Sequence, residues 1–201
     1  MIISASQTFE SAAAGVYPAR LYRLIDLGTQ TGDYQGKSTK ARKLLLSFEL
    51  LGEDRMTDGK PFTISRRFTA SLSDKAALRA FINQWRSKAL NDDEVKAFDV
   101  AKLLGVYGFV NLTESTRDGK TYTNIASISP LPKGMPKPDG VNTLQLFDLS
   151  APDWNVFEAL GERLQEQIAS SPEYQAAQGW GKQDPAPTNN AASFDDDSIP
   201  F

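Results

Sequence analysis

The chain of 201 residues contains no cysteine and no histidine. Without cysteine it has no disulfide, no thiolate nucleophile and no zinc site with sulfur ligands. The absence of histidine removes the commonest general base and the commonest metal ligand, and it rules out a Ser-His-Asp arrangement. We therefore expect no enzymatic activity, no cofactor and no metal site.

Long hydrophobic runs are also missing. No stretch approaches the roughly 20 apolar residues that a membrane-spanning helix needs. The first residues, Met1 to Ala5, lack the basic region that begins a secretory signal. We therefore expect a cytoplasmic protein that has no membrane partner.

Charge is distributed unevenly, although the formal net charge is only -3. Residues 15–134 contain 19 Lys and Arg against 13 Asp and Glu, a net charge of +6. Residues 135–201 contain 3 Lys and Arg against 11 Asp and Glu, a net charge of -8. A basic body with an acidic tail is typical of a nucleic-acid-binding protein that recruits partners. Chance segregation of surface charge is the alternative interpretation.

Five segments of the basic body show the alternating pattern of β-strands. They are residues 15–27, 42–51, 61–70, 105–113 and 121–129. Arg23 interrupts the apolar face of the first segment, which predicts a β-bulge there. A polar loop with glycines is expected at residues 28–40. Asp118-Gly119 predicts a tight hairpin turn between the last two strands.

Between the third and fourth strands the apolar spacing becomes helical. The stripe consists of Leu78, Phe81, Ile82 and Trp85. Ser71 and Asp74 offer a capping box for this helix, and a short helical segment is expected around residues 100–104. Three strands, a helix and two strands is the order of the OB fold. We therefore predict a mainly β protein built on a five-stranded OB barrel.

The composition changes after residue 130. Four prolines and two glycines between residues 130 and 140 indicate a stiff linker. Ser150 and Asp153 predict the start of an amphipathic helix that packs on its own domain or in an interface of a homo-oligomer. Its apolar stripe consists of Trp154, Phe157, Leu160, Leu164 and Ile168. From Gly179 onward, small and polar residues predict disorder.

These patterns divide the chain into four parts. They are an N-terminal arm (1–14), an OB-fold domain (15–134), a linker with the C-terminal helix (135–178) and a disordered tail (179–201). The basic body would therefore carry one activity, and the acidic tail another.

The tail ends in three aspartates that are followed, after Ser198, by an apolar tip. A terminal aromatic residue beside a proline suits a hydrophobic pocket, and an Arg or Lys of a partner can hold the terminal carboxylate. The predicted partner-binding residues are Asp195, Asp196, Asp197, Ile199, Pro200 and Phe201. The alternative is an acidic tail that is only solvated.

This ending resembles the acidic tip of bacterial and phage single-stranded DNA-binding proteins, which typically reads Asp-Asp-Asp-Ile-Pro-Phe. Here Ser198 lengthens the spacer between the acids and Ile199 by one residue. The resemblance implies that the tip recruits replication, recombination and repair proteins, and that the body binds single-stranded DNA without sequence specificity. The extra helix and sparse tail look more like a phage-encoded member, which implies the cytoplasm of a bacterial host.

Non-specific binding of single strands needs cations along the backbone and aromatic faces on which bases stack. An OB fold presents them on strands 2 and 3 and on the loops that join strands 1–2 and 4–5. The candidates are Tyr34, Lys37, Lys40, Arg42, Lys43, Arg66, Arg67, Tyr107, Phe109, Arg117, Lys120 and Tyr122. An RNA binder and a protein-interaction module that captures a host replication factor are the alternative functions.

One motif near these candidates resembles a phosphate-binding loop. Residues Gly32 to Ser38 are one residue too short for it, because Thr31 stands where the first glycine belongs. A strand is expected after the motif, whereas a phosphate loop opens a helix. We therefore predict no nucleotide hydrolysis.

Overall fold

The computed structural model describes residues 10–34 and 36–180 of the chain. Five strands form an antiparallel sheet: β1 (Gly15–Tyr34), β2 (Lys37–Leu50), β3 (Thr63–Thr69), β4 (Tyr107–Arg117) and β5 (Lys120–Ser129). Their order across the sheet is β3-β2-β1-β4-β5, and a short sixth strand, β6 (Gln145–Phe147), pairs with β1 in parallel. The mainly β architecture is therefore confirmed.

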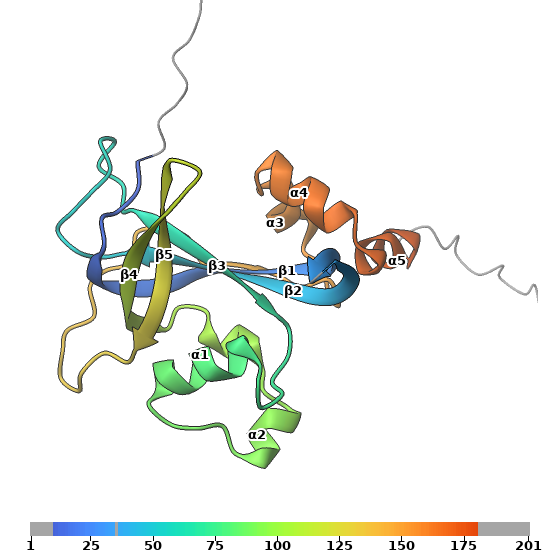
Figure 1. Cartoon of the computed structure of the whole chain (residues 1–201), viewed down its shortest axis with the longest axis horizontal. Coiled ribbons are helices and arrows are strands. Elements are labelled where there is room, and N and C mark those ends of the chain that lie inside the picture. The colour runs from blue at the N-terminus through green and yellow to red at the C-terminus, as the bar shows by residue number, and fades with distance from the viewer. Residues whose placement is uncertain (1–9, 35, 181–201) are drawn as a thin grey trace, which may run out of the picture.

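The helices of the described residues are short. They are α1 (Ala77–Arg86), α2 (Asp92–Lys96), the 3-10 helix η1 (Val100–Leu103), α3 (Trp154–Glu158), α4 (Glu162–Ala169) and α5 (Pro172–Trp180). In Figure 1, α1 and α2 lie on one side of the sheet, and α3 to α5 lie beside the β1–β2 hairpin on the other.

The sheet is not closed into the expected barrel. β3 and β5 stand at the two ends of the strand order, and no backbone ladder joins them in the part of the chain that the structure describes. Arg66 of β3 bridges this gap, because its Nη1 donates a 3.0 Å hydrogen bond to the carbonyl oxygen of Ile125 on β5. Its guanidinium also lies over the rings of Phe68 and Phe81. The side chain therefore fills the seam that a closed barrel would seal with backbone hydrogen bonds.

The helix stripe predicted for α1 is confirmed in the first hydrophobic core. Leu78, Phe81, Ile82 and Trp85 are each at most 3% exposed. Trp85 Nε1 donates a 2.9 Å hydrogen bond to the carbonyl oxygen of Tyr107. The close approach requires Gly108, because a Cβ there would lie 2.6 Å from Trp85 Nε1. The helix and β4 are thus fixed against each other.

A second core lies on the opposite face of the sheet. Adjacent strand residues point to opposite faces, so Leu24 and Leu46 join the first core while Ile25 and Leu45 join the second. The helices α3, α4 and α5 cover this second core. A sheet that buries both faces leaves little room for polar side chains on its central strands.

The hairpin of β1 and β2 is longer than predicted. A register shift between Leu21 and Arg23 confirms the bulge expected at Arg23. The predicted loop at residues 28–40 is wrong, because the two strands stay paired as far as Tyr34 and Lys37. β-branched threonines in this stretch favour a strand over a loop. We call residues 29–42 of this hairpin, as far as they are described, the lysine ribbon.

Two turn and cap predictions have different outcomes. The Asp118-Gly119 turn is confirmed, and both residues have the positive φ, 52° and 71°, that a two-residue hairpin turn needs. The capping box of Ser71 and Asp74 is wrong. The helix α1 begins later, after Ala76, and this N-cap residue makes no side-chain cap hydrogen bond. Asp74 instead pairs with Arg79.

Helical segments outside α1 were predicted in part. The segment expected near residues 100–104 is the 3-10 helix η1, whereas α2 was not predicted. The single helix expected after Ser150 is divided into α3, α4 and α5. Asp153 caps α3 as expected, since its side chain accepts a 3.0 Å hydrogen bond from the amide of Asn155. The stripe packs within its own chain, because Leu160 and Ile168 are buried in the second core.

A buried carboxylate fixes the segment that leads from β5 to β6. Glu49 of β2 is 0% exposed, and its Oε1 lies 2.5 Å from Arg20. Its Oε2 accepts hydrogen bonds from the backbone amides of Val141 (3.1 Å) and Asn142 (2.8 Å). A carboxylate can be buried only when such partners replace water. The end of the predicted linker is therefore bound to the sheet.

We predict that Glu49→Ala lowers the free energy of unfolding by about 3 kcal/mol, because it removes the carboxylate partner of Arg20 and the acceptor of two backbone amides. Urea unfolding measures this loss, with Glu53→Ala as the control because Glu53 is exposed. A loss below about 1 kcal/mol would show that the carboxylate is not a principal anchor.

Candidate nucleic-acid interface

The lysine ribbon presents exposed cations on β2. Lys37 and Lys40 are exposed and stand opposite Tyr34 and Thr31 in the ladder. Within the described residues, neither lysine forms an ion pair with a carboxylate. Lys43 follows further along the strand, and its Nζ donates a 2.7 Å hydrogen bond to Thr69 Oγ1 on β3. Lys37 and Lys40 are therefore available to phosphate groups, whereas Lys43 is half-buried and already hydrogen-bonded.

Arg42, which also lies on β2, is held within the fold. Its guanidinium pairs with Asp26, a carboxylate only 4% exposed. Asp26 Oδ1 also accepts a 3.0 Å hydrogen bond from the amide of Gly28. The hydrogen bond with Asp26 raises the pKa of Arg42. Because the guanidinium of Arg42 is the ion-pair partner of this buried carboxylate, we assign Arg42 to the fold rather than to the interface.

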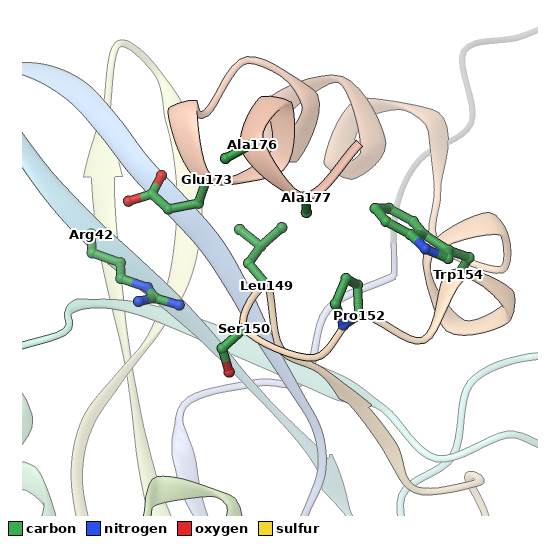
Figure 2. A pocket seen from close by; sticks show the side chains of 8 residues that line it. All are labelled: Arg42, Leu149, Ser150, Pro152, Trp154, Glu173, Ala176 and Ala177. Atoms are coloured by element: carbon green, nitrogen blue, oxygen red, sulfur yellow. The ribbon is translucent and has the colours of Figure 1, made fainter. Parts of the chain in front are cut away.

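A cavity of about 640 Å³ lies beside Arg42 (Figure 2). Figure 2 shows Arg42 and Glu173 on one side and Trp154 on the other, with Leu149 between them. Burial raises the pKa of Glu173, but hydrogen bonds from the amide and hydroxyl of Thr29 more than offset this, and the pKa lies below its ordinary value. The charged carboxylate therefore docks α5 onto β1.

Carboxylates near this cavity determine which ligands it could bind. Asp148 lies 3.9 Å from Arg42, so that Asp26, Asp148 and Glu173 together surround one guanidinium. Three carboxylates around one cation give this region a negative balance. The cavity is therefore a poor site for a phosphate group.

The side chains of the adjacent residues Arg66 and Arg67 lie on opposite faces of β3. Arg66 points into the seam between β3 and β5, as described above. Arg67 is exposed, and its Nη2 donates a 2.9 Å hydrogen bond to Gln167 Oε1 on α4. Alternation along β3 explains this division, because neighbouring side chains lie on opposite faces. Only Arg67 remains near Lys43 on the outer face.

Two aromatic candidates lie together on the outer face of β4. Tyr107 and Phe109 are half-buried, while Gly108 and Val110 between and after them point into the core. The ring of Tyr107 has a cation above it, since Lys137 Nζ lies 5.6 Å from the ring centroid. The predicted outward direction of both rings is thus confirmed.

The hairpin tip of β4 and β5 carries the remaining candidates. Arg117 and Lys120 are exposed, and Tyr122 is 49% exposed. Arg117 and Tyr122 line a hollow of about 420 Å³ that also includes Asp118. An aromatic ring beside two cations is the combination that a single strand needs.

The structure separates the two loops that an OB groove was expected to combine. β4 pairs with residues 15–20 of β1, and its tip continues beyond that end of the strand. The lysine ribbon lies at the other end of β1. Figure 1 shows the two hairpin tips at different ends of the molecule. The candidates therefore form a ribbon group, an aromatic pair on β4 and a hairpin-tip group.

Some predicted residues lie outside the described residues. They are the side chain of Tyr34 and the six residues of the tip, Asp195, Asp196, Asp197, Ile199, Pro200 and Phe201. The motif at Gly32–Ser38 lies at the turn of the ribbon and continues into β2 rather than into a helix. The absence of a strand-loop-helix arrangement agrees with the interpretation that it is no phosphate loop.

Sequence reasoning missed the roles of Asp26, Glu49 and Lys137. Asp26 and Glu49 alternate with apolar residues as exposed strand residues do, so the pattern gave no sign of their burial. Lys137 lies in a proline-containing segment whose path over Tyr107 depends on contacts with the sheet. The pattern carries no signal for such long-range contacts.

We predict that Arg42→Ala lowers the free energy of unfolding by about 2 kcal/mol, because it leaves the buried Asp26 without its cation. The loss is smaller than for a fully buried pair since the Arg42 side chain is 42% exposed. Lys40→Ala, two residues away, should change stability by less than about 0.5 kcal/mol. Thermal and urea unfolding compare the two variants, and equal losses would contradict the assignment of Arg42 to the fold.

Comparisons with known proteins give no family for the chain. Neither a scan against protein-family models nor a search of curated proteins finds a match. Within residues 10–34 and 36–180, no group of three or more Asp or Glu side chains could hold a metal ion. None of the helices in these ranges is long and apolar enough to cross a membrane. A function must therefore be argued from the surfaces described above.

Proposed function

We propose that the protein binds single-stranded DNA without sequence specificity through a partly open OB-type sheet. The strand order β3-β2-β1-β4-β5, with α1 between β3 and β4 in the chain, suits a five-stranded OB barrel opened between β3 and β5. Arg66 and the packing of α1 hold the two free edges near each other. The proposal also assigns the C-terminal tip to the recruitment of replication, recombination or repair proteins.

The observation that carries the proposal is the set of lysines on β2 that form no ion pair with a carboxylate of residues 10–34 and 36–180. Lys37 and Lys43 are six residue steps apart on one face of β2, which is about 20 Å of regular β-structure, and Lys40 between them points to the opposite face. A phosphate backbone that reaches this hairpin meets Lys37 and Lys40, which form no ion pair with a carboxylate of the described residues, whereas Lys43 already donates a hydrogen bond to Thr69. Counterions released from the DNA would supply much of the binding free energy.

The aromatic pair on β4 supplies the second requirement. Tyr107 and Phe109 lie on the outer face of the sheet with their rings partly exposed. Stacking on such rings tolerates every base, because each base has a π-face. Arg42 and Arg66 are left out of the proposed interface since their guanidinium groups are bound within the fold.

We predict that Lys37→Glu with Lys40→Glu weakens binding to an oligo-dT strand by at least about tenfold at low salt. The variant should also lower the slope of log K against log salt by about two, one for each lysine. Fluorescence anisotropy at several salt concentrations measures both quantities.

The matched control is Lys75→Glu with Lys88→Glu, which makes the same change of charge at two exposed lysines near the ends of α1. An equal loss in both variants would show that only net charge matters, and the ribbon would then not be the interface. Competition by RNA of equal length separates a DNA preference from general oligonucleotide binding.

A separate prediction concerns the tail. A chain that ends at residue 183 lacks the terminal aspartates and the Ile-Pro-Phe tip, and we expect it to bind oligo-dT as tightly as the full chain or more tightly. The physical reason is that an acidic segment repels or competes with phosphate. Anisotropy titrations of both chains test this prediction. Failure of both chains to bind would leave the protein-interaction module as the better function.

A further inference from the structure

A second cavity, of about 400 Å³, opens where the outer face of β4 begins. Tyr107 lies at this point, and the walls include the apolar side chains of Leu104, Val106 and Leu131. Arg86 and Lys137 are the charged side chains of its lining, and no carboxylate belongs to the lining in the part of the chain that the structure describes. The cavity therefore combines apolar walls with two cationic side chains.

The two cations differ in how fully the fold uses them. Lys137 is exposed and forms no ion pair with a carboxylate of the described residues. Arg86 donates from Nη2 to Glu94 Oε1 at 2.6 Å, but its Nη1 is buried and has no hydrogen-bond acceptor among residues 10–34 and 36–180. A buried donor of a charged group without an acceptor costs free energy. Nη1 itself is closed to solvent, but Arg86 lines the cavity, so its charge attracts an anion there.

The position of the cavity connects it to the proposed stacking surface. Phe109 and Tyr107 follow each other along the outer face of β4, and Tyr107 also lines the cavity. When the bases of a single-stranded DNA stack on these two rings, the next nucleotide lies at the cavity. The apolar walls suit the faces of a base, and the cations suit its phosphate.

We propose that this cavity holds the phosphorylated end of a single strand, an inference that rests on the proposed function. An internal phosphodiester carries one negative charge. A terminal phosphate carries about -1.5 to -2 charges at pH 7 and three acceptor oxygens, so it can bind Lys137 and Arg86 together. The protein then distinguishes strand ends from the interior of a strand, in addition to binding either one.

The test uses full-length protein and three oligo-dT strands of equal length, which end in a 5′-phosphate, a 3′-phosphate or hydroxyl groups only. Competition against one labelled strand gives their relative affinities. We expect one phosphorylated strand to bind about tenfold more tightly than the hydroxyl-ended strand. Lys137→Ala should abolish this preference. Lys133→Ala, at an exposed lysine of the same segment outside the cavity lining, should keep it.

Three outcomes overturn or redirect the inference. Equal affinity of the wild-type protein for all three DNA strands overturns the inference and leaves the proposed function intact. A preference for a phosphorylated strand that survives Lys137→Ala has the same consequence. If no strand binds, the proposed function fails, and titration with thymidine 3′,5′-bisphosphate then tests the cavity by itself. Binding of this bisphosphate that is lost in Lys137→Ala supports the proposed site. If the wild-type protein does not bind the bisphosphate, the inference is overturned.

Discussion

The buried carboxylate of Glu49 is the contact on which the arrangement of the chain beyond β5 depends. It lies on β2, pairs with Arg20 of β1 and accepts two amides of residues 141 and 142. One side chain thus connects two strands with the segment that leads to β6. A carboxylate without water must be fully satisfied, and this requirement allows few alternative paths for the segment.

The path of that segment determines which parts of the sheet are covered. Because residues 141 and 142 are bound to the sheet, β6 lies beside β1, and Phe147 reaches the second core. The helices α3 to α5 then cover the β1–β2 end of the outer face. The same segment brings Lys137 over Tyr107 at the β4 end. Beyond these helices, the exposed Lys37 and Lys40 remain at one end of the sheet and the half-buried rings of Tyr107 and Phe109 at the other.

The sequence predicted the local structure well and the long-range structure in part. Alternation identified five strands, the helical spacing from Leu78 to Trp85 identified α1, and Asp118-Gly119 identified a turn, because each signal is contained in a few neighbouring residues. The division of the C-terminal helix and the existence of β6 depend on contacts between segments far apart in the chain. Arg42 and Arg66 show the same limit at the candidate interface. Their charge is visible in the sequence, but the buried Asp26 and the seam that hold them are not.

The open seam between β3 and β5 matters for the proposed binding of single-stranded DNA. Free sheet edges invite pairing with another chain unless they are covered or carry charge. Here Arg66 occupies the seam, and its contacts with Ile125, Phe68 and Phe81 tie both edges to the first core. The edges are thus held in place by a side chain. The lysines lie on β2 and the rings on β4, but the outer face of β1 between them is covered by residues 141 and 142 near Arg20 and by α4 and α5 farther along the strand. The two groups therefore present separate surfaces rather than one continuous track across the sheet.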